Sequence, residues 1–406
     1  MGYLSFNSTV KDSRGIILTA SSGKEPLLVV LEPAFKESDY SQKYLPLIEK
    51  HLDSDFFDIH VIGSSSGLKV LRKKYQHVYS VPFYPHSAYR LQLFVGYLVY
   101  LMYAFFLTVQ QSLRIGVKVV VSLGGHPYSG FIASLAAKLT RKKSIIRISE
   151  PTRFIVKKRY TLGSLVSKII SLQERISFAF ADVIITNRDM KWYSNGVSGK
   201  QVMLSQGINL SLFNASSHPA IASSSFPKLI TVARLDKQKN IGNVIKAVSL
   251  LIDRYPNIKY YVVGRGPDEE ELRRNSSLIN GSGEHILFCG NISPQMIPGY
   301  LKSADFFVFP SSIEGLPSAV LEAMACGLPV ILSSTQFGWS KWFVDGENVL
   351  LVKGDPESIV SAIEKLMRHS QLRHRLVENA MGYVKKNHDS SKTRQRFVSI
   401  YEMTVN

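Results

Sequence analysis

Short apolar runs recur along the first half of the chain, and most are separated by segments with the periodicity of an amphipathic helix. Runs of this length that are rich in Val and Ile predict buried strands. Their alternation with helices predicts an α/β domain with a doubly wound parallel sheet. We expect its strands at residues 27–31, 58–62, 78–81, 117–122, 144–148 and 182–186.

The alternation stops at residues 214–227, a Ser-, Ala- and Pro-rich segment without periodicity, and then restarts. The restart predicts a second doubly wound sheet, with strands at 229–232, 259–263, 285–288, 305–309 and 329–333. Ligands bind beyond the carboxyl ends of such strands, so two facing Rossmann-like domains imply a cleft. We expect a polar tail at 1–25, a first domain at 26–213, a linker at 214–227, a second domain at 228–385 and a last helix at 386–406.

One helix of the second domain places two carboxylates. Pro317 suits a first helical position and Gly327 is a stop signal, so we expect a helix from about Pro317 to Cys326. Glu314 then lies just ahead of the helix and Glu322 lies within it. They are badly placed to act together on one bond. We expect them to hold two parts of one elongated ligand, beside backbone N–H groups that favour an anion.

Composition limits the class of protein. A chain of 406 residues that is 45% hydrophobic has room for two domains with cores. Two cysteines, Cys289 and Cys326, exclude a disulfide framework and a Cys-rich metal site, which favours a reducing compartment. Residues 1–24 are polar and Ser-rich rather than an apolar signal segment. We therefore expect a cytoplasmic protein.

The net charge of +18 falls mostly in the first half of the chain. Basic clusters there would attract anionic lipid or an acidic substrate, and they are also typical of a solvated surface. Nucleic acid is a disfavoured partner, because no nucleic-acid-binding motif accompanies the charge. The clusters are Arg72-Lys73-Lys74, Arg141-Lys142-Lys143 and Lys157-Lys158-Arg159.

Residues 93–109 form an apolar, aromatic run without a charge, at the lower length limit of a membrane span. The run lies between two predicted strands. If both strands belong to one sheet, a span would divide that sheet between the two sides of a bilayer. A helix whose face dips into the membrane interface and a buried helix remain as alternatives. The first of these would place the protein on the inner face of a membrane.

Loops after strands of the second domain carry further candidate residues. Arg234 and Lys239 follow one strand and could clamp a diphosphate, although such a pair is also common on surfaces. The turn from Gly264 to Pro267 follows the next strand, and its glycines let backbone approach a ligand.

Taken in order, these motifs resemble the family 4 retaining glycosyltransferases, which have the two-domain GT-B fold. The resemblance covers residues 229–352, and a segment at 202–213 adds to it with Gln206 where the family has Asn. The motifs are Arg234…Lys239, Val263-Gly264-x-Gly266-Pro267, Phe288-x-Gly290, Ala304-Asp305…Pro310-Ser311, Glu314-Gly315 and Glu322-Ala323-Met324-Ala325-x-Gly327-x-Pro329-Val330.

The resemblance implies a nucleotide-diphosphate sugar as donor and assigns roles in holding it. Glu322 would hold the ribose hydroxyls, and Glu314 would hold the transferred sugar. The backbone of Gly315, Leu316, Pro317 and Ser318 would share that task, and Gly264 and Gly290 would also line the donor site. The last helix would cross back onto the first domain.

The resemblance also implies a mechanism without a metal or other cofactor. Arg234 and Lys239 would neutralise the leaving diphosphate, where negative charge develops in the transition state. Retention would follow from attack of the acceptor on the face that the diphosphate leaves. A hydrolase-like pair of flanking carboxylates is then unnecessary. The acceptor would be a glycan or a lipid-linked molecule.

The chain departs from the family pattern at several positions. Glu150 stands where the family often has a sugar-contacting His, and His126 is an alternative contact on the sugar or acceptor side. Lys36 or the pair Gly124-Gly125 would replace a Gly-rich loop of the first domain. Residues 337–341 replace a Gly-Gly-x-x-Glu motif, so the identity of the sugar does not follow from the resemblance.

Two rival hypotheses belong to other classes. Asp53-Ser54-Asp55 has the pattern of the metal-binding motif of GT-A transferases, although it is also typical of a charge cluster at a helix end. A GT-B-shaped epimerase, or a catalytically silent nucleotide-sugar-binding or membrane-docked interaction protein, is the second rival. It would bind a donor without transferring the sugar.

Overall fold

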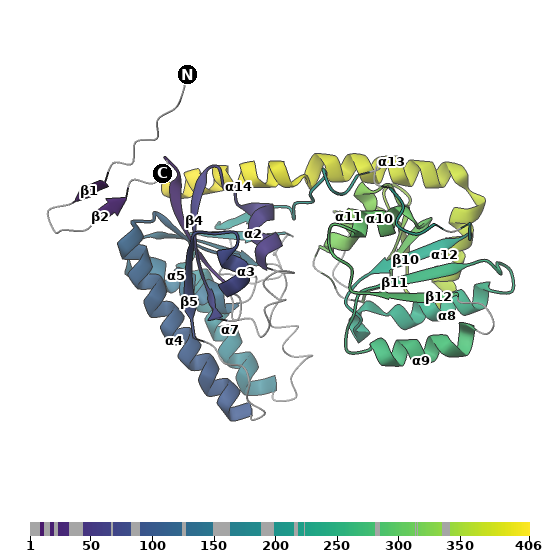
Figure 1. The fold of residues 1–406 in the computed structure, drawn as a ribbon, viewed down its shortest axis with the longest axis horizontal. Helices are drawn as coiled ribbons and strands as arrows, with labels where there is room; N and C mark the ends of the chain where they lie inside the picture. Colours follow the sequence, from purple (N-terminus) through teal and green to yellow (C-terminus); the bar gives the residue numbers. More distant parts are fainter. Residues whose placement is uncertain are drawn as a thin grey trace, which may run out of the picture. The chain divides into compact units, whose positions relative to one another are not determined.

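A computed structural model of the chain describes residues 9–11, 17–19, 23–31, 44–65, 68–82, 90–123, 127–148, 163–187, 199–214, 218–222, 224–280, 285–312, 314, 316–334 and 342–406 (Figure 1). The chain forms two compact units. The first comprises Met1–Ser205 and Thr393–Asn406, and the second comprises Gln206–Lys392. The division therefore falls ahead of the predicted linker. Ile208, Phe213 and Ile221 pack in the core of the second unit.

The first unit is built on a seven-stranded sheet in the order β5-β4-β3-β6-β7-β8-β9, in which all neighbours are parallel. The central strands are continuous apolar runs, as strands covered on both faces require. The bounds are β3 Glu25–Val30, β4 Phe57–Ser64, β5 His77–Val81, β6 Val119–Ser122, β7 Lys143–Ile148, β8 Val183–Thr186 and β9 Gln201–Met203.

Helices cover both faces of this sheet (Figure 1). One face packs against α2 (Leu45–His51), α3 (Leu68–Arg72) and the last helix, α14 (Ser390–Val405). The other packs against α4 (Arg90–Ile115), α5 (Pro127–Leu139) and α7 (Gly163–Phe180). Phe397 and Tyr401 of α14 make edge-to-face contacts with Phe57. The last helix is therefore part of the first unit's core.

Helix α4 has two contrasting faces. One face packs on the sheet through Tyr100, Ala104, Thr108 and Ser112, whose side chains are fully buried. The opposite face exposes large apolar side chains, from 52% to 64% accessible, namely Val99, Met102, Tyr103, Phe106 and Leu113.

The segment Leu98–Ile115 has the length and composition of a membrane span, and a third of it is buried. Strands β5 and β6, which flank the helix in the chain, belong to one sheet. This was the condition that argued against a span. One face of the helix packs in the core, and the opposite face is exposed apolar surface.

The second unit has a six-stranded parallel sheet in the order β12-β11-β10-β13-β14-β15. Its strands are β10 Lys228–Val232, β11 Lys259–Val263, β12 Ile286–Gly290, β13 Phe306–Phe309, β14 Val330–Ser333 and β15 Leu350–Val352. One face is covered by α10 (Ile297–Lys302), α11 (Ser318–Ala325) and α13 (Ser370–Asn387). The other is covered by α8 (Ile241–Leu251), α9 (Glu269–Asn280) and α12 (Pro356–Arg368).

Local sequence signals fix α12 at both ends. The side chain of Asp355 accepts a hydrogen bond from the Ser358 backbone N–H at 2.9 Å, and Pro356 occupies the first turn. Lys365 and Arg368 lie in the last turn, where a cation interacts favourably with the helix dipole. The buried residues of α12 recur at helical spacing, and Ile359, Ile363 and Leu366 face the sheet.

Two features of the predicted ends differ from the structure. The polar tail expected at residues 1–25 contains an antiparallel pair, β1 (Thr9–Lys11) with β2 (Ile17–Thr19), and its last residue, Glu25, begins β3. The last helix predicted at 386–406 corresponds to the end of α13 followed by α14. His388 lies between the two helices and forms hydrogen bonds with the Gln206 carbonyl and the Tyr383 hydroxyl.

Candidate functional site

The order of strands in the second unit defines a switch point between β10 and β13. From β10 the chain builds β11 and β12 on one side, and it then returns to place β13 on the other side. The loops that leave the carboxyl ends of β10 and β13 therefore diverge from adjacent strands. In open α/β sheets this is where ligands bind. Arg234 and Lys239 follow β10, and Glu314 follows β13.

The two loops are joined by hydrogen bonds. The Ser312 backbone N–H donates to the Gln238 carbonyl at 2.9 Å. The Asn240 side-chain amide donates to the Pro310 carbonyl at 3.0 Å, and Asn240 itself adopts a left-handed conformation at φ 52°. The Ser333 hydroxyl, from the end of β14, donates to the Ser311 carbonyl. Three successive strand ends therefore hold this edge in one arrangement.

Lys239 and Glu314 form an ion pair at the junction of the loops. Their side chains are only 16% and 8% exposed. The Ser311 hydroxyl donates to the same carboxylate oxygen, Glu314 Oε1, at 2.7 Å, and the Lys239 ammonium lies 5.5 Å from the centre of the Phe309 ring. Sequence analysis assigned the two residues to leaving group and sugar, and the structure brings them into direct contact. The result is a fixed, largely desolvated cation beside an oriented carboxylate.

Arg234 differs from Lys239 in its surroundings. Its side chain is 59% exposed, and its Nε lies 3.8 Å from Asp236 Oδ2. The other carboxylate oxygen, Asp236 Oδ1, is buried without a hydrogen-bond partner among the residues that the structure describes. Sequence analysis did not single out Asp236. Its position between Arg234 and Lys239 in one short loop could have indicated that it belongs to the same site.

Gly264 and Gly266 serve to pack two loops together. A Cβ on Gly264, at φ 131°, would lie 1.9 Å from the Ala233 carbonyl oxygen, and one on Gly266 would lie 2.1 Å from that of Leu235. The Leu235 N–H donates to the Arg265 carbonyl at 3.0 Å. The approach of backbone predicted at this turn is therefore an approach to the β10 loop, which it holds in place.

Gly290 also has a positive φ, 69°, and ends β12. A Cβ on Gly290 would meet the Arg265 side chain at 3.6 Å, an ordinary contact distance. The Gly290 carbonyl accepts a hydrogen bond from the Gly264 N–H at 2.7 Å. At Gly290 a larger residue is therefore disfavoured by the positive φ, and the space around it would admit a Cβ.

Helix α11 begins one residue later than predicted, at Ser318, and ends at Ala325, with Pro317 and Cys326 in the flanking positions. Leu316 is buried ahead of it and anchors the loop. Glu322 lies on the side of the helix that is only partly buried, while its neighbours Leu321 and Ala323 are in the core. Burial also raises the pKa of the Cys326 thiol to about 12, so this cysteine is an inert core residue.

Several candidate residues lie outside the described part of the chain. These are Lys36, Gly124, Gly125, His126, Glu150, Gly315 and residues 337–341. The first sheet has a switch point of its own between β3 and β6, and ligands bind at such an edge in open α/β sheets.

The Asp53-Ser54-Asp55 motif has a structural use. The Asp53 carboxylate accepts a hydrogen bond from the Asp55 backbone N–H at 2.9 Å, in the turn between α2 and β4. The Ser54 carbonyl accepts one from the Lys24 ammonium at 2.6 Å. This turn precedes the amino end of β4, so it lies away from the carboxyl edge of the sheet.

The first unit also contains a buried cation that sequence analysis missed. Arg147 on β7 is 4% exposed, and its guanidinium donates to the Leu123 carbonyl at 3.5 Å. Burial, with the charge of Arg147 as the second cause, holds the pKa of His51 well below its usual value. A single arginine within the apolar strand "KSIIRI" was the available signal.

The two parallel sheets, each changing direction at a switch point and each covered by helices, define the GT-B class of α/β fold. A solved structure of HepE from Anabaena, in complex with UDP and glucose, is similar over 92% of this chain and 99% of its own, with a TM-score of 0.71 and 15% identity. Residues 217–382 match the family model described as glycosyl transferases group 1. The match lies within the second unit.

Two relatives match part of the chain. An uncharacterized glycosyltransferase of Methanocaldococcus jannaschii is 34% identical over 44% of this chain and 46% of its own length. A GDP-mannose-dependent alpha-(1-6)-phosphatidylinositol monomannoside mannosyltransferase of Mycolicibacterium smegmatis is 32% identical over 35% of this chain and 38% of its own. The chain thus matches less than half the length of these two relatives.

Proposed function

We propose that the protein is a retaining, metal-independent glycosyltransferase that uses a nucleoside-diphosphate sugar. The observation that carries the proposal is the Lys239–Glu314 pair, held with little exposure where the loops of β10 and β13 diverge. A cation fixed at such an edge is suited to bind an anionic leaving group. The match of residues 217–382 to the family model and the UDP complex of the structurally similar HepE support a donor of this class.

In the proposed step the bond between the anomeric carbon and a diphosphate oxygen breaks, and the electron pair leaves with the diphosphate. The acceptor oxygen bonds to the same carbon on the same face and gives its proton to the departing phosphate oxygen. Lys239 and Arg234 stabilise the charge that develops on the diphosphate. No second carboxylate is required as a nucleophile, and neither Glu314 nor Glu322 is assigned that role.

Glu314 and Glu322 hold different ends of the donor in this proposal. Glu314 is oriented by Ser311 and Lys239, and an oriented carboxylate at this edge is suited to accept hydrogen bonds from sugar hydroxyls. Glu322 is partly exposed on α11, within reach of a second group of hydroxyls such as those of a ribose.

The experiment that tests this function measures release of nucleoside diphosphate from UDP-, GDP- and ADP-sugars, with membrane lipid extract as acceptor. We expect acceptor-dependent release from one donor and no loss of rate in EDTA. The anomeric configuration of the product, read by NMR, would match that of the donor. Binding of a donor without turnover would instead favour a silent nucleotide-sugar-binding protein. Loss of activity in EDTA that Mg²⁺ or Mn²⁺ restores would contradict the metal-independent mechanism.

We infer that the acceptor is presented at a membrane surface. The exposed apolar face of α4 combines aromatic and aliphatic side chains, which bind the interfacial region of a bilayer. The net charge of +18 favours a surface of anionic lipid, such as the inner face of a cytoplasmic membrane. The lipid-linked acceptor named for the mycolicibacterial relative is consistent with an acceptor of this kind.

Replacing Met102 and Phe106 together by glutamate is expected to weaken binding to anionic vesicles at least tenfold. The two side chains are 62% and 64% exposed, so the change removes apolar area and adds two charges without disturbing the core. Co-sedimentation with phosphatidylglycerol vesicles measures the effect. Leu278→Glu is the control, because Leu278 is 87% exposed on α9 of the second unit. Equal binding by the double variant and the wild type would contradict the inference.

A further inference from the structure

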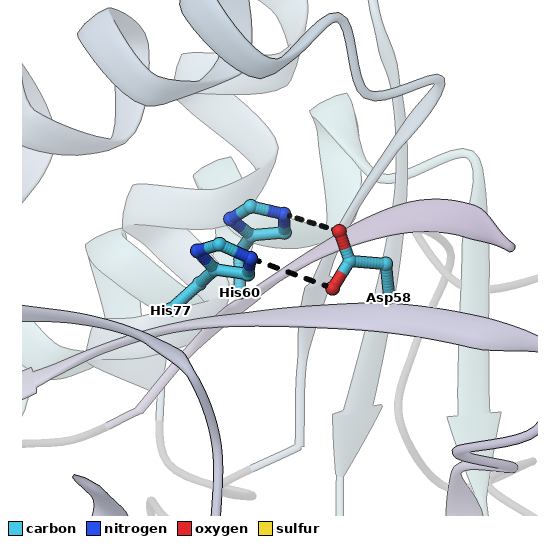
Figure 2. A group of neighbouring side chains, drawn as sticks. All are labelled: Asp58, His60 and His77. Atoms are coloured by element: carbon cyan, nitrogen blue, oxygen red, sulfur yellow. Dashed lines mark hydrogen bonds and ion pairs between the residues drawn. The ribbon is translucent and has the colours of Figure 1, made fainter. Parts of the chain in front are cut away.

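Three metal-ligating side chains converge on one face of the first sheet. Asp58 and His60 are two residues apart on β4, so they point to the same side of the strand. His77 opens β5 and is the register partner of His60. Figure 2 shows both imidazole rings directing a nitrogen at the Asp58 carboxylate.

The distances within this cluster suit a small cation. His60 Nε2 lies 3.1 Å from Asp58 Oδ2, and His77 Nε2 lies 3.8 Å from Asp58 Oδ1. One ligand atom from each residue lies within 4.8 Å of the others. Ligands at about 2.0–2.2 Å from a tetrahedral zinc ion are roughly 3.3 Å apart. The two imidazole rings stack with centroids 4.2 Å apart, and His77 is 41% exposed, so it has room to turn toward a shared ion.

A second group orients the buried histidine. The other ring nitrogen of His60, Nδ1, lies 3.1 Å from the Tyr79 hydroxyl. Metal-bound histidines characteristically use their second nitrogen in this way, which fixes the ring and its tautomer. In the structure His60 Nε2 donates its hydrogen bond to Asp58 Oδ2 at 3.1 Å. A bound ion would replace that proton, and with Nδ1 donating to the Tyr79 hydroxyl the Nε2 lone pair of His60 would point at the ion.

From this geometry we propose that Asp58, His60 and His77 bind a divalent transition metal, with Zn²⁺ as the ion to test. Two imidazoles and one carboxylate are ligands that zinc accepts, and the remaining position is left to water. His60 is 6% exposed whereas His77 is 41% exposed, so the ion would enter from the His77 side.

The position of the cluster indicates what the metal does. Asp58 and His77 lie at the amino ends of parallel strands, at the opposite edge from the switch point of this sheet. The metal is therefore separate from the proposed transfer chemistry. Strand β5 is the edge strand of the sheet and is paired only with β4 among the described strands. An ion shared between them fastens this edge strand to the sheet.

The test uses the full-length chain without a histidine tag, stripped of metal with a chelator. Zn²⁺ titration by calorimetry is expected to show a single tight site, with a rise in the melting temperature of the first unit. Asp58→Asn and His77→Gln keep the size of each side chain similar, and each is expected to weaken binding at least tenfold and to abolish the rise. His374→Gln, at an exposed position of α13, is the control for binding to surface histidines.

Two results would overturn the proposal. One is Zn²⁺ binding by the Asp58→Asn and His77→Gln variants with wild-type affinity and stoichiometry. The other is that wild type binds Zn²⁺ only through surface histidines, so that His374→Gln removes all of the binding. Asp58, His60 and His77 would then be a hydrogen-bonded cluster without a metal. Substitution of Co²⁺ gives an independent readout, because its visible absorption reports histidine and carboxylate ligands. Neither readout depends on transferase activity, so failure of either proposal is distinguishable from failure of the other.

Discussion

Lys239→Ala is expected to lower kcat/KM for the nucleotide-sugar donor by about 10²–10³-fold, the usual effect of removing one fixed group that stabilises transition-state charge. The ammonium is held by Glu314 and shielded from water, so a free lysine or solvent cation would not replace it. Steady-state rates of nucleoside diphosphate release measure the loss. Because the leaving diphosphate is the group affected, the decrease should appear mainly in kcat.

Lys237→Ala is the matched control for this prediction. Lys237 and Lys239 belong to one 3-10 turn, residues Lys237–Lys239, but Lys237 is exposed. The control should retain nearly full activity. Lys239→Ala also leaves the buried Glu314 without its cation, which costs roughly 3–5 kcal/mol of stability. The double variant with Glu314→Gln removes the unpaired charge and should regain stability but not activity. Wild-type rates in a folded Lys239→Ala variant would refute the assignment.

Gly264→Ala adds a single methyl group and is expected to lower the stability of the second unit by roughly 3–5 kcal/mol. We expect this to be the largest loss that one added methyl group causes in that unit. The added Cβ would lie 1.9 Å from the Ala233 carbonyl oxygen, which is backbone and cannot swing aside, and φ at this position is 131°. Relief requires the β10 loop to move, so donor affinity should fall as well. Thermal or urea unfolding measures the first effect, and donor titration measures the second.

Gly382→Ala is the control for the glycine prediction. Gly382 lies in the middle of α13, and a Cβ there would meet nothing within 4 Å. Alanine is the better helix former, so this change should stabilise the unit by about 0.5–1 kcal/mol. If Gly264→Ala proved as mild as Gly382→Ala, the proposed close packing of the β11 turn against the β10 loop would be wrong.

The long apolar strands and the loops that follow them could be predicted from the sequence. Residues 260–263, for example, are continuous Tyr and Val, and the structure places β11 at Lys259–Val263. Strands β9 and β15 were missed, because each has three residues at the edge of a sheet and no periodicity can be read from so few. The division between the two compact units falls ahead of the predicted linker. Polar composition marked residues 214–227, but apolar side chains within and before that segment pack onto the second unit.

Contacts between distant residues were the part of the candidate site that sequence could not supply. Lys239 and Glu314 were both singled out, yet their pairing depends on β10 lying beside β13, which only the strand order determines. The cluster of Asp58, His60 and His77 likewise depends on the register of β4 with β5. A histidine in a strand pattern carries no such information by itself. Gly264 was expected to let the backbone approach a ligand, whereas a glycine is required there by the Ala233 carbonyl group, thirty-one positions earlier in the chain.

The packing of α14 has a consequence for the order of folding during synthesis. The second unit is continuous from Gln206 to Lys392, whereas the first unit requires residues 393–406 to close its core around Phe397, Ile400 and Tyr401. On the ribosome, domains generally fold as they emerge, beginning at the N-terminus. Here the first unit emerges early but must wait until its last helix has been made. Until then the sheet face that α14 will cover stays exposed, including Phe57, which contacts Phe397 and Tyr401 in the folded unit. This apolar face is therefore the surface that a nascent-chain chaperone would need to protect.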